Sequence, residues 1–85
     1  MKIKEGFILR EVAGDSIVMP SSEMNINAMI TLNETGAFLW KLLESETTEE
    51  ELTAAIMKQY TVEEEIAKTA VHNFVEKLKE HEFLA

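Results

Sequence analysis

Cysteine is absent from this chain of 85 residues. Its absence excludes disulfide bonds, thiolate nucleophiles and zinc or iron–sulfur sites that cysteine would hold. No run approaches the ~20 apolar residues of a membrane-spanning helix, and residues 1–6 lack the apolar core of a signal peptide. A small domain without disulfides is typical of a reducing compartment, so we expect a cytoplasmic protein.

Basic residues are also scarce. Sixteen Asp and Glu residues outnumber eight Lys and Arg residues, the net charge is −8, and Arg10 is the only arginine. Proteins that bind nucleic acids concentrate positive charge to displace counterions. The composition therefore argues against nucleic acids and anionic membranes. It favours a neutral or basic partner, or one bound through backbone and apolar contacts.

Residues for catalysis or metal binding form no recognisable pattern. Asp15 is the only aspartate, and the three glycines are too dispersed for a phosphate-binding loop. The serines have no nucleophile-elbow motif around them. His72 and Glu76, four residues apart, would supply at most half of a metal site. We therefore predict a protein that is not an enzyme and that has no catalytic residues, no metal and no cofactor.

Apolar residues make up 46% of the chain, which is enough for one small domain over its whole length. Two strands are predicted at 7–12 and 16–19, and the turn between them at 13–15 contains glycine, as hairpin turns often do. Pro20 should end the second strand because it lacks a backbone donor. Val12 is expected to share the apolar face of the first strand through an irregularity near the turn.

A third strand is predicted over residues 25–32, where apolar and polar residues alternate. Its sequence contains no Lys, no Pro and no inward charge to protect an exposed edge. Such an edge can accept an extended peptide by strand addition. A cover formed by the N-terminal segment or by a second copy of the chain is an equally open alternative.

The central helix is predicted to begin after Asn33, which would cap it, and to end near residues 44–46. A capping box from Thr31 is the alternative start. Gly36 in the first turn indicates close approach of another backbone. Trp40, the only tryptophan, is expected to be a packing anchor.

Two further helices are predicted, each opened by a capping box, at Thr48-x-x-Glu51 and at Thr61-x-x-Glu64. The last one carries an apolar stripe of Ile66, Ala67, Ala70, Val71, Phe74, Val75 and Leu78. Phe83 and Leu84 should fold back onto the core. Strands followed by helices indicate an α+β fold with an antiparallel sheet, and the last two helices form a helix-turn-helix-like pair.

Several segments together resemble one known family. They are Leu32-Asn33-Glu34-Thr35-Gly36-Ala37-x-x-Trp40-x-Leu42-Leu43, Thr47-Thr48-Glu49-Glu50-Glu51-Leu52, Tyr60-x-Val62, Val71-x-x-Phe74-Val75-x-x-Leu78 and Phe83-Leu84. In this pattern the chain is similar to the PqqD-like family, named for pyrroloquinoline quinone synthesis protein D, from about residue 7 to residue 84. The resemblance implies a winged-helix-like arrangement of a three-stranded antiparallel sheet followed by three helices.

The resemblance also implies a function. Members are peptide chaperones, or recognition elements, that bind the leader of a ribosomally made precursor peptide. They hold it as an added strand on the third strand, beside the third helix, and present it to a modifying enzyme, often a radical SAM protein. Carried onto this sequence, the peptide-binding residues would be Asn27, Met29, Thr31, Ile66, Ala70, Asn73, Phe74 and Lys77.

The sequence departs from the family pattern at two places. Members commonly carry Gly before the final apolar pair, where this chain has Glu82. Many carry Asp-Gly between the first two helices, where this chain has Glu44-Ser45-Glu46. The second departure weakens any assignment to quinone synthesis itself. The alternatives are a winged-helix DNA-binding regulator, which the acidic last helix disfavours, and a structural or dimerisation module that is a monomer or a strand-mediated homodimer.

Overall fold

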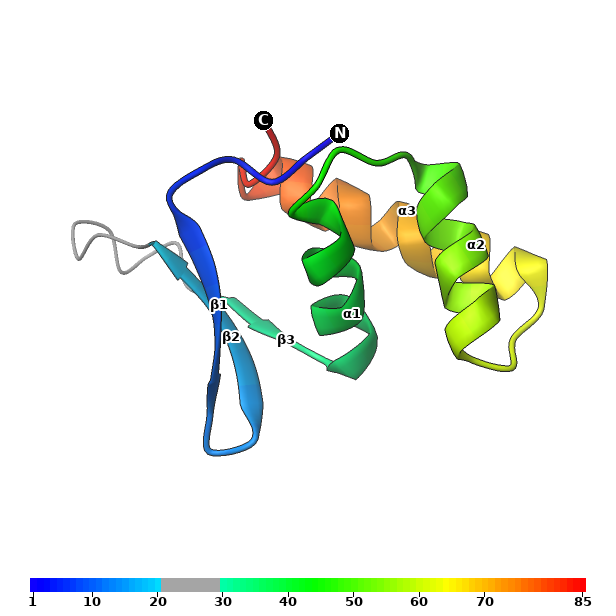
Figure 1. The fold of residues 1–85 in the computed structure, drawn as a ribbon, viewed down its shortest axis with the longest axis horizontal. Helices are drawn as coiled ribbons and strands as arrows, with labels where there is room; N and C mark the ends of the chain where they lie inside the picture. The colour runs from blue at the N-terminus through cyan, green and yellow to red at the C-terminus, as the bar shows by residue number, and fades with distance from the viewer. Residues whose placement is uncertain (21–29) are drawn as a thin grey trace.

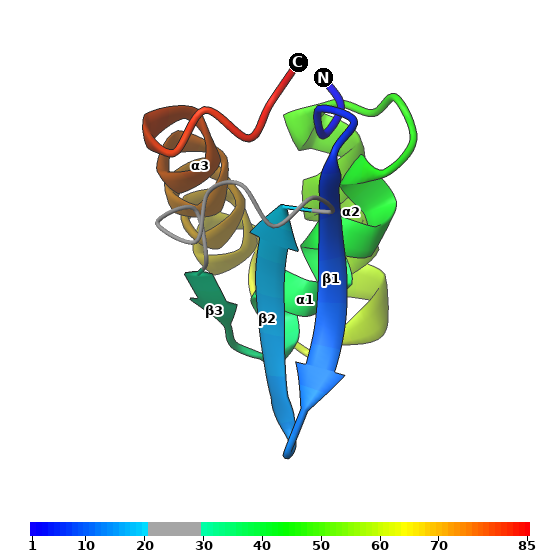
Figure 2. The same cartoon turned by 90° about the vertical axis from the view of Figure 1, so that its left-hand side faces the viewer.

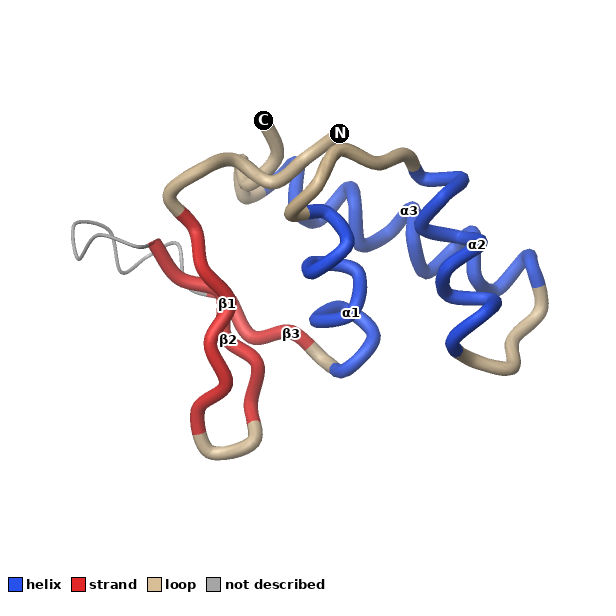
Figure 3. The backbone as a smooth tube through the Cα atoms, viewed as in Figure 1, coloured by secondary structure: helices blue, strands red, loops and turns tan. Residues whose placement is uncertain are grey.

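The computed structural model describes residues 1–20 and 30–85, and in them all strands precede all helices. The elements are β1 (Phe7–Val12), β2 (Asp15–Pro20), β3 (Ile30–Leu32), α1 (Glu34–Leu43), α2 (Glu49–Gln59) and α3 (Glu64–Glu80). The sheet occupies one side of the molecule and the helices the other, with α1 nearest the sheet (Figures 1 and 3). The predicted α+β fold, with an antiparallel sheet followed by three helices, is confirmed.

The sheet is antiparallel throughout, in the order β1-β2-β3. Its hairpin turn has two residues, Ala13 and Gly14, both with positive φ (53° and 88°), because Val12 already pairs with Asp15. The expected three-residue turn is therefore wrong. The register has no irregularity, so Val12 points to the face opposite Phe7 and is 49% exposed, contrary to prediction.

β3 is an edge strand, paired only with β2 among the described residues. Within it Leu32 is buried and Thr31 exposed, as the predicted alternation requires. The remainder of the strand predicted at 25–32 lies outside the described residues. Within residues 1–20 and 30–85, the N-terminal segment does not pair with this edge. It bridges instead to the C-terminal tail, through Ile3 and Leu84 (Figure 2).

Asn33 caps α1, as predicted. Its side-chain Oδ1 accepts a hydrogen bond of 2.7 Å from the backbone N–H of Gly36. The helix then buries its apolar residues, and Trp40 is fully buried with its ring edge-on to Phe83 at a centroid distance of 5.8 Å. The prediction that Trp40 is a packing anchor is confirmed.

Thr48 caps α2 by accepting a 3.1 Å hydrogen bond from the N–H of Glu51, as expected. The capping box predicted at Thr61 does not form, because α3 begins at Glu64 after an N-cap, Glu63, that makes no side-chain cap bond. The linker before it is not helical and packs Val62 against the core. Burying an apolar side chain there outweighs one cap hydrogen bond, which contributes about 1 kcal/mol.

α3 ends in a Schellman motif, in which Phe83 N–H donates to Leu78 O (2.9 Å) and Glu82 N–H donates to Lys79 O (3.0 Å). Glu82 therefore takes a left-handed conformation, with φ of 59°. Glycine adopts this conformation without strain, whereas a residue with a Cβ, such as Glu82, does not. The predicted return of the C-terminal tail is confirmed, since Phe83 is fully buried against Trp40 and Phe7.

The buried face of α3 consists of Ala67, Val71, Val75 and Leu78. Ile66, expected in the same stripe, is 59% exposed, because the first turns of α3 extend away from the sheet beyond α1 (Figure 1). Among residues 1–20 and 30–85, no helix is both long enough and apolar enough to cross a membrane.

Candidate functional site

A groove runs between the edge strand β3 and the helix α3, beside the start of α1. Its volume is about 520 Å³. It is lined by Thr31, Asn33, Thr35, Gly36, Leu39, Ala70, Asn73, Phe74 and Lys77. We call it the β3–α3 groove.

Five of the eight residues predicted to bind a peptide line this groove. Thr31 comes from β3, and Ala70, Asn73, Phe74 and Lys77 come from α3. The last three of these α3 positions lie three, four and seven residues after Ala70, so a single helix face carries all four. The predicted Asn27 and Met29 lie outside the described residues.

Ile66 is the exception among the described residues, since it does not line the β3–α3 groove. It lies one helical turn before Ala70 and contributes to a small, mainly apolar hollow with Glu65, Thr69 and Ala70. Because Ala70 lines both hollows, they adjoin along the same side of α3. An extended ligand in the groove that continued past Ala70 would reach Ile66.

The floor of the groove depends on Gly36. A Cβ atom on this residue would lie 3.2 Å from Cε1 of Phe74 and 3.1 Å from Oδ1 of Asn33. Both separations are shorter than ordinary van der Waals contact, so glycine leaves the space in which the Phe74 ring packs on α1. The prediction that a backbone approaches Gly36 is therefore wrong, because the close neighbours are side-chain atoms of three residues: Phe74, Asn33 and Leu32.

Four lining residues were missed by the sequence reasoning, and all follow β3 directly: Asn33, Thr35, Gly36 and Leu39. The signal that could have found them is the segment Leu32–Leu43 that carries the family resemblance. The sequence predicts that this segment ends the third strand and begins the central helix. In the structure its first turn also forms part of the groove wall.

Lys77 is the only charged residue that lines the β3–α3 groove among the described residues. The rest of the lining is neutral: hydroxyl, amide, small and apolar side chains. The lining of the groove therefore carries one positive charge, although the net charge of the chain is −8. Negative charge on a bound molecule is favoured near Lys77 and disfavoured over most of the remaining surface.

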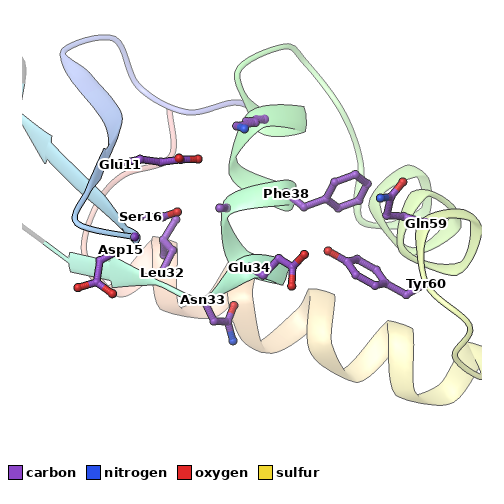
Figure 4. A pocket seen from close by; sticks show the side chains of 12 residues that line it. Glu11, Asp15, Ser16, Leu32, Asn33, Glu34, Phe38, Gln59 and Tyr60 are labelled. Atoms are coloured by element: carbon purple, nitrogen blue, oxygen red, sulfur yellow. The ribbon is translucent and has the colours of Figure 1, made fainter.

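A second hollow lies on the other side of the β3–α1 junction (Figure 4). Its volume is about 570 Å³. It is lined by Glu11, Gly14, Asp15, Ser16, Leu32, Asn33, Glu34, Ala37, Phe38, Lys41, Gln59 and Tyr60. We call it the hairpin cleft, because the tip of the β1–β2 hairpin forms one wall. Asn33 lines both hollows and separates them.

His72 and Glu76, which were considered as half of a metal site, each pair with a different residue. Nδ1 of His72 lies 3.4 Å from Oε1 of Glu49, which links α3 to the start of α2. Glu76 instead pairs with Lys79, at 3.3 Å between Oε2 and Nζ. In the described part of the chain, no three His, Asp or Glu side chains are arranged to hold a metal ion.

Comparison with known proteins gives one family and one related structure. The sequence pattern of the family described as "Coenzyme PQQ synthesis protein D (PqqD)" matches residues 7–84, nearly the whole chain. No curated protein matches the sequence as a whole. A solved structure, "TbiB1 in Complex with the TbiA(beta) Leader Peptide", superposes with a TM-score of 0.78 at 23% identity, over 99% of this chain and 94% of that chain. The superposition establishes a shared fold.

Proposed function

We propose, since this chain belongs to the PqqD family, that it is a non-catalytic peptide-binding module whose ligand is the leader segment of a precursor peptide. The observation that carries the proposal is the β3–α3 groove, where an edge strand faces one side of a helix across a hollow. TbiB1, which shares the fold, was solved with a leader peptide. That structure supports a ligand of the same class here.

The edge of β3 is the first wall of the site. An edge strand has backbone N–H and C=O groups without partners in its own sheet, and an extended peptide can bind them by adding a fourth strand. Leu32 anchors β3 in the core, so the edge is held in place before any ligand arrives. Backbone pairing supplies affinity that depends little on the peptide's sequence.

The face of α3 is the second wall and supplies selectivity. Ala70 has a small side chain that lets a peptide approach the helix, and Phe74 offers a half-buried ring for an apolar contact. Asn73 can donate to and accept from a peptide backbone. Lys77 adds a positive charge at the same face. We therefore infer a ligand with an apolar side chain over Phe74 and a carboxylate near Lys77.

A module of this kind contributes binding and leaves chemistry to its partner. The bound leader would hold the precursor peptide close to a modifying enzyme, which raises the effective concentration of the segment to be modified. We propose a radical SAM enzyme as that partner, from the family to which the chain belongs. The partner would carry its own cofactor.

The test is a titration of the ¹⁵N-labelled chain with the leader of the precursor peptide encoded beside its gene. We expect amide shifts at residues 30–36 and 70–77. Lys77→Gln should weaken binding several-fold, whereas Lys79→Gln should leave it unchanged, because Lys79 carries the same charge on the same helix outside the groove. Shifts confined to α2 and the hairpin tip would overturn the assignment.

A strand-mediated homodimer makes a different prediction. If a second copy occupies the β3 edge, sedimentation should show a concentration-dependent dimer that added leader dissociates. If the chain stays monomeric at high concentration, the edge is free for the peptide.

A further inference from the structure

The geometry points to the hairpin cleft as a docking surface for a basic segment of a partner protein. The cleft is as large as the β3–α3 groove, about 570 Å³ against about 520 Å³. Its walls come from the hairpin tip, the end of β3, one side of α1 and the end of α2 (Figure 4). The docking proposal does not require a peptide in the groove.

Charge selects the class of partner. Three carboxylates line the cleft, those of Glu11, Asp15 and Glu34, against one ammonium group, that of Lys41. All four residues are exposed, and within the described residues none of the three carboxylates forms an ion pair. The local charge is therefore −2, opposite in sign to that of the groove. An acidic peptide would be repelled here, and Arg or Lys side chains would be attracted.

Aromatic rings make the cleft more than a charged surface. The rings of Phe38 and Tyr60 meet edge-on, with centroids 5.9 Å apart and planes at 86°. Both residues are half-buried, so the rings are held by the core while part of each remains accessible. Figure 4 shows the Tyr60 hydroxyl pointing toward Glu34. A guanidinium group could stack on these rings and pair with the carboxylates, a combination for which Arg is better suited than Lys.

Asn33 lies at the boundary between the cleft and the groove. Because this residue lines both hollows, a protein docked in the cleft would lie directly across α1's first turn from a peptide in the groove. We propose that a basic segment of the modifying enzyme, with an arginine flanked by apolar residues, occupies the cleft. The enzyme and the leader would then bind side by side without competing.

The test uses a short cationic probe, acetyl-Leu-Arg-Leu-Arg-amide, added to the intact ¹⁵N-labelled chain. We expect saturable amide shifts at residues 11–16, 34–41 and 59–60. The sign-reversed probe acetyl-Leu-Glu-Leu-Glu-amide should not shift them. No saturable shift with the cationic probe, or shifts centred on residues 70–77, would overturn the proposal.

Matched variants distinguish binding in the cleft from non-specific attraction of the cationic probe to an acidic protein. Glu11→Gln with Glu34→Gln removes two cleft charges and should weaken the cationic probe roughly five-fold. Glu50→Gln with Glu80→Gln removes two exposed charges outside the cleft and should change affinity less than two-fold. Equal weakening by both pairs would show non-specific attraction and sink the proposal. The leader titration reports on other residues, so either proposal can fail while the other stands.

Discussion

The β3–α3 groove and the hairpin cleft are two hollows of similar volume on opposite sides of Asn33. They differ in charge, because Lys77 alone is charged in the groove, whereas three carboxylates and one lysine line the cleft. The difference teaches that size does not distinguish their ligands. The charge of the lining does distinguish them, and the first turn of α1 would keep the two proposed ligands apart.

The two hollows also differ in how their walls are held. The lining of the groove includes Leu39, which is buried in the core, and Phe74, which is half-buried and packs against it. The outer wall of the cleft is the hairpin tip, residues 10–15, and every residue in it is exposed. A two-stranded ribbon outside the core is marginally stable on its own. We therefore regard the groove as preformed and the cleft as adjustable.

The largest expected effect comes from a matched pair of aromatic truncations. Phe74→Ala and Phe38→Ala each remove a half-buried ring packed on the core, so each should destabilise the fold by about 2 kcal/mol in chemical denaturation. Phe74→Ala should also weaken binding of the leader about five-fold, and Phe38→Ala should weaken binding of the arginine probe by a similar factor. If either variant affected both ligands equally, the two hollows would not be independent sites.

A substitution at Asn33 should change the ligand affinities of the two sites in opposite directions. Asn33→Ala removes the cap of α1 and should cost about 1 kcal/mol in thermal unfolding. Asn33→Asp keeps the cap but adds a negative charge between the hollows. We expect the aspartate variant to bind the leader more weakly and the arginine probe more tightly, as measured by calorimetry. A parallel change in both affinities would contradict the electrostatic distinction.

Glu82→Gly tests stability away from both hollows. Its left-handed backbone strains any residue with a Cβ, so glycine should stabilise the domain by about 1 kcal/mol, seen as a higher unfolding midpoint. Glu80→Gly, two residues earlier in α3, has no positive φ to relieve and should not stabilise. Both variants should bind leader and arginine probe normally. A stabilised variant with altered binding would show that the C-terminal cap communicates with the sites.

The smallest effect on stability is expected for Gly36→Ala. Alanine gains helix propensity of up to ~1 kcal/mol, but its Cβ would press on Phe74 at 3.2 Å and on Asn33 at 3.1 Å. These effects should offset to within about 0.5 kcal/mol. The displaced Phe74 ring should narrow the groove and weaken leader binding a few-fold. Binding of the arginine probe at the cleft should not change. Unchanged leader binding would mean that Phe74 does not define the groove floor.

Much of the fold was predictable because local chemistry decides it. The Asn33 cap, the Thr48 cap, the strand pairing around a glycine-containing turn and the burial of Trp40 all follow from residue type and spacing. The predictions that failed depend on distant partners. The helix at 64 begins late because its preceding linker packs on the core, and Val12 faces outward because the register stays regular.

The groove was predicted only in part for the same reason. The family resemblance pointed to Ala70, Asn73, Phe74 and Lys77 on the last helix, but it could not show that Ile66 projects beyond the sheet. The hairpin cleft had no sequence signal at all. Its carboxylates and aromatic rings come from the hairpin, from α1 and from the residue after α2, and these segments meet only because α1 packs between the hairpin and α2.

The sequence by itself determined an acidic chain with strands before helices, side-chain caps on the first two helices and a family pattern that extends over residues 7–84. The tertiary structure decided which surfaces became hollows and what charge each of them carries. Local patterns fix elements, because capping and periodicity act over a few residues. A hollow is formed by side chains from several elements, so its shape and charge exist only once those elements pack together.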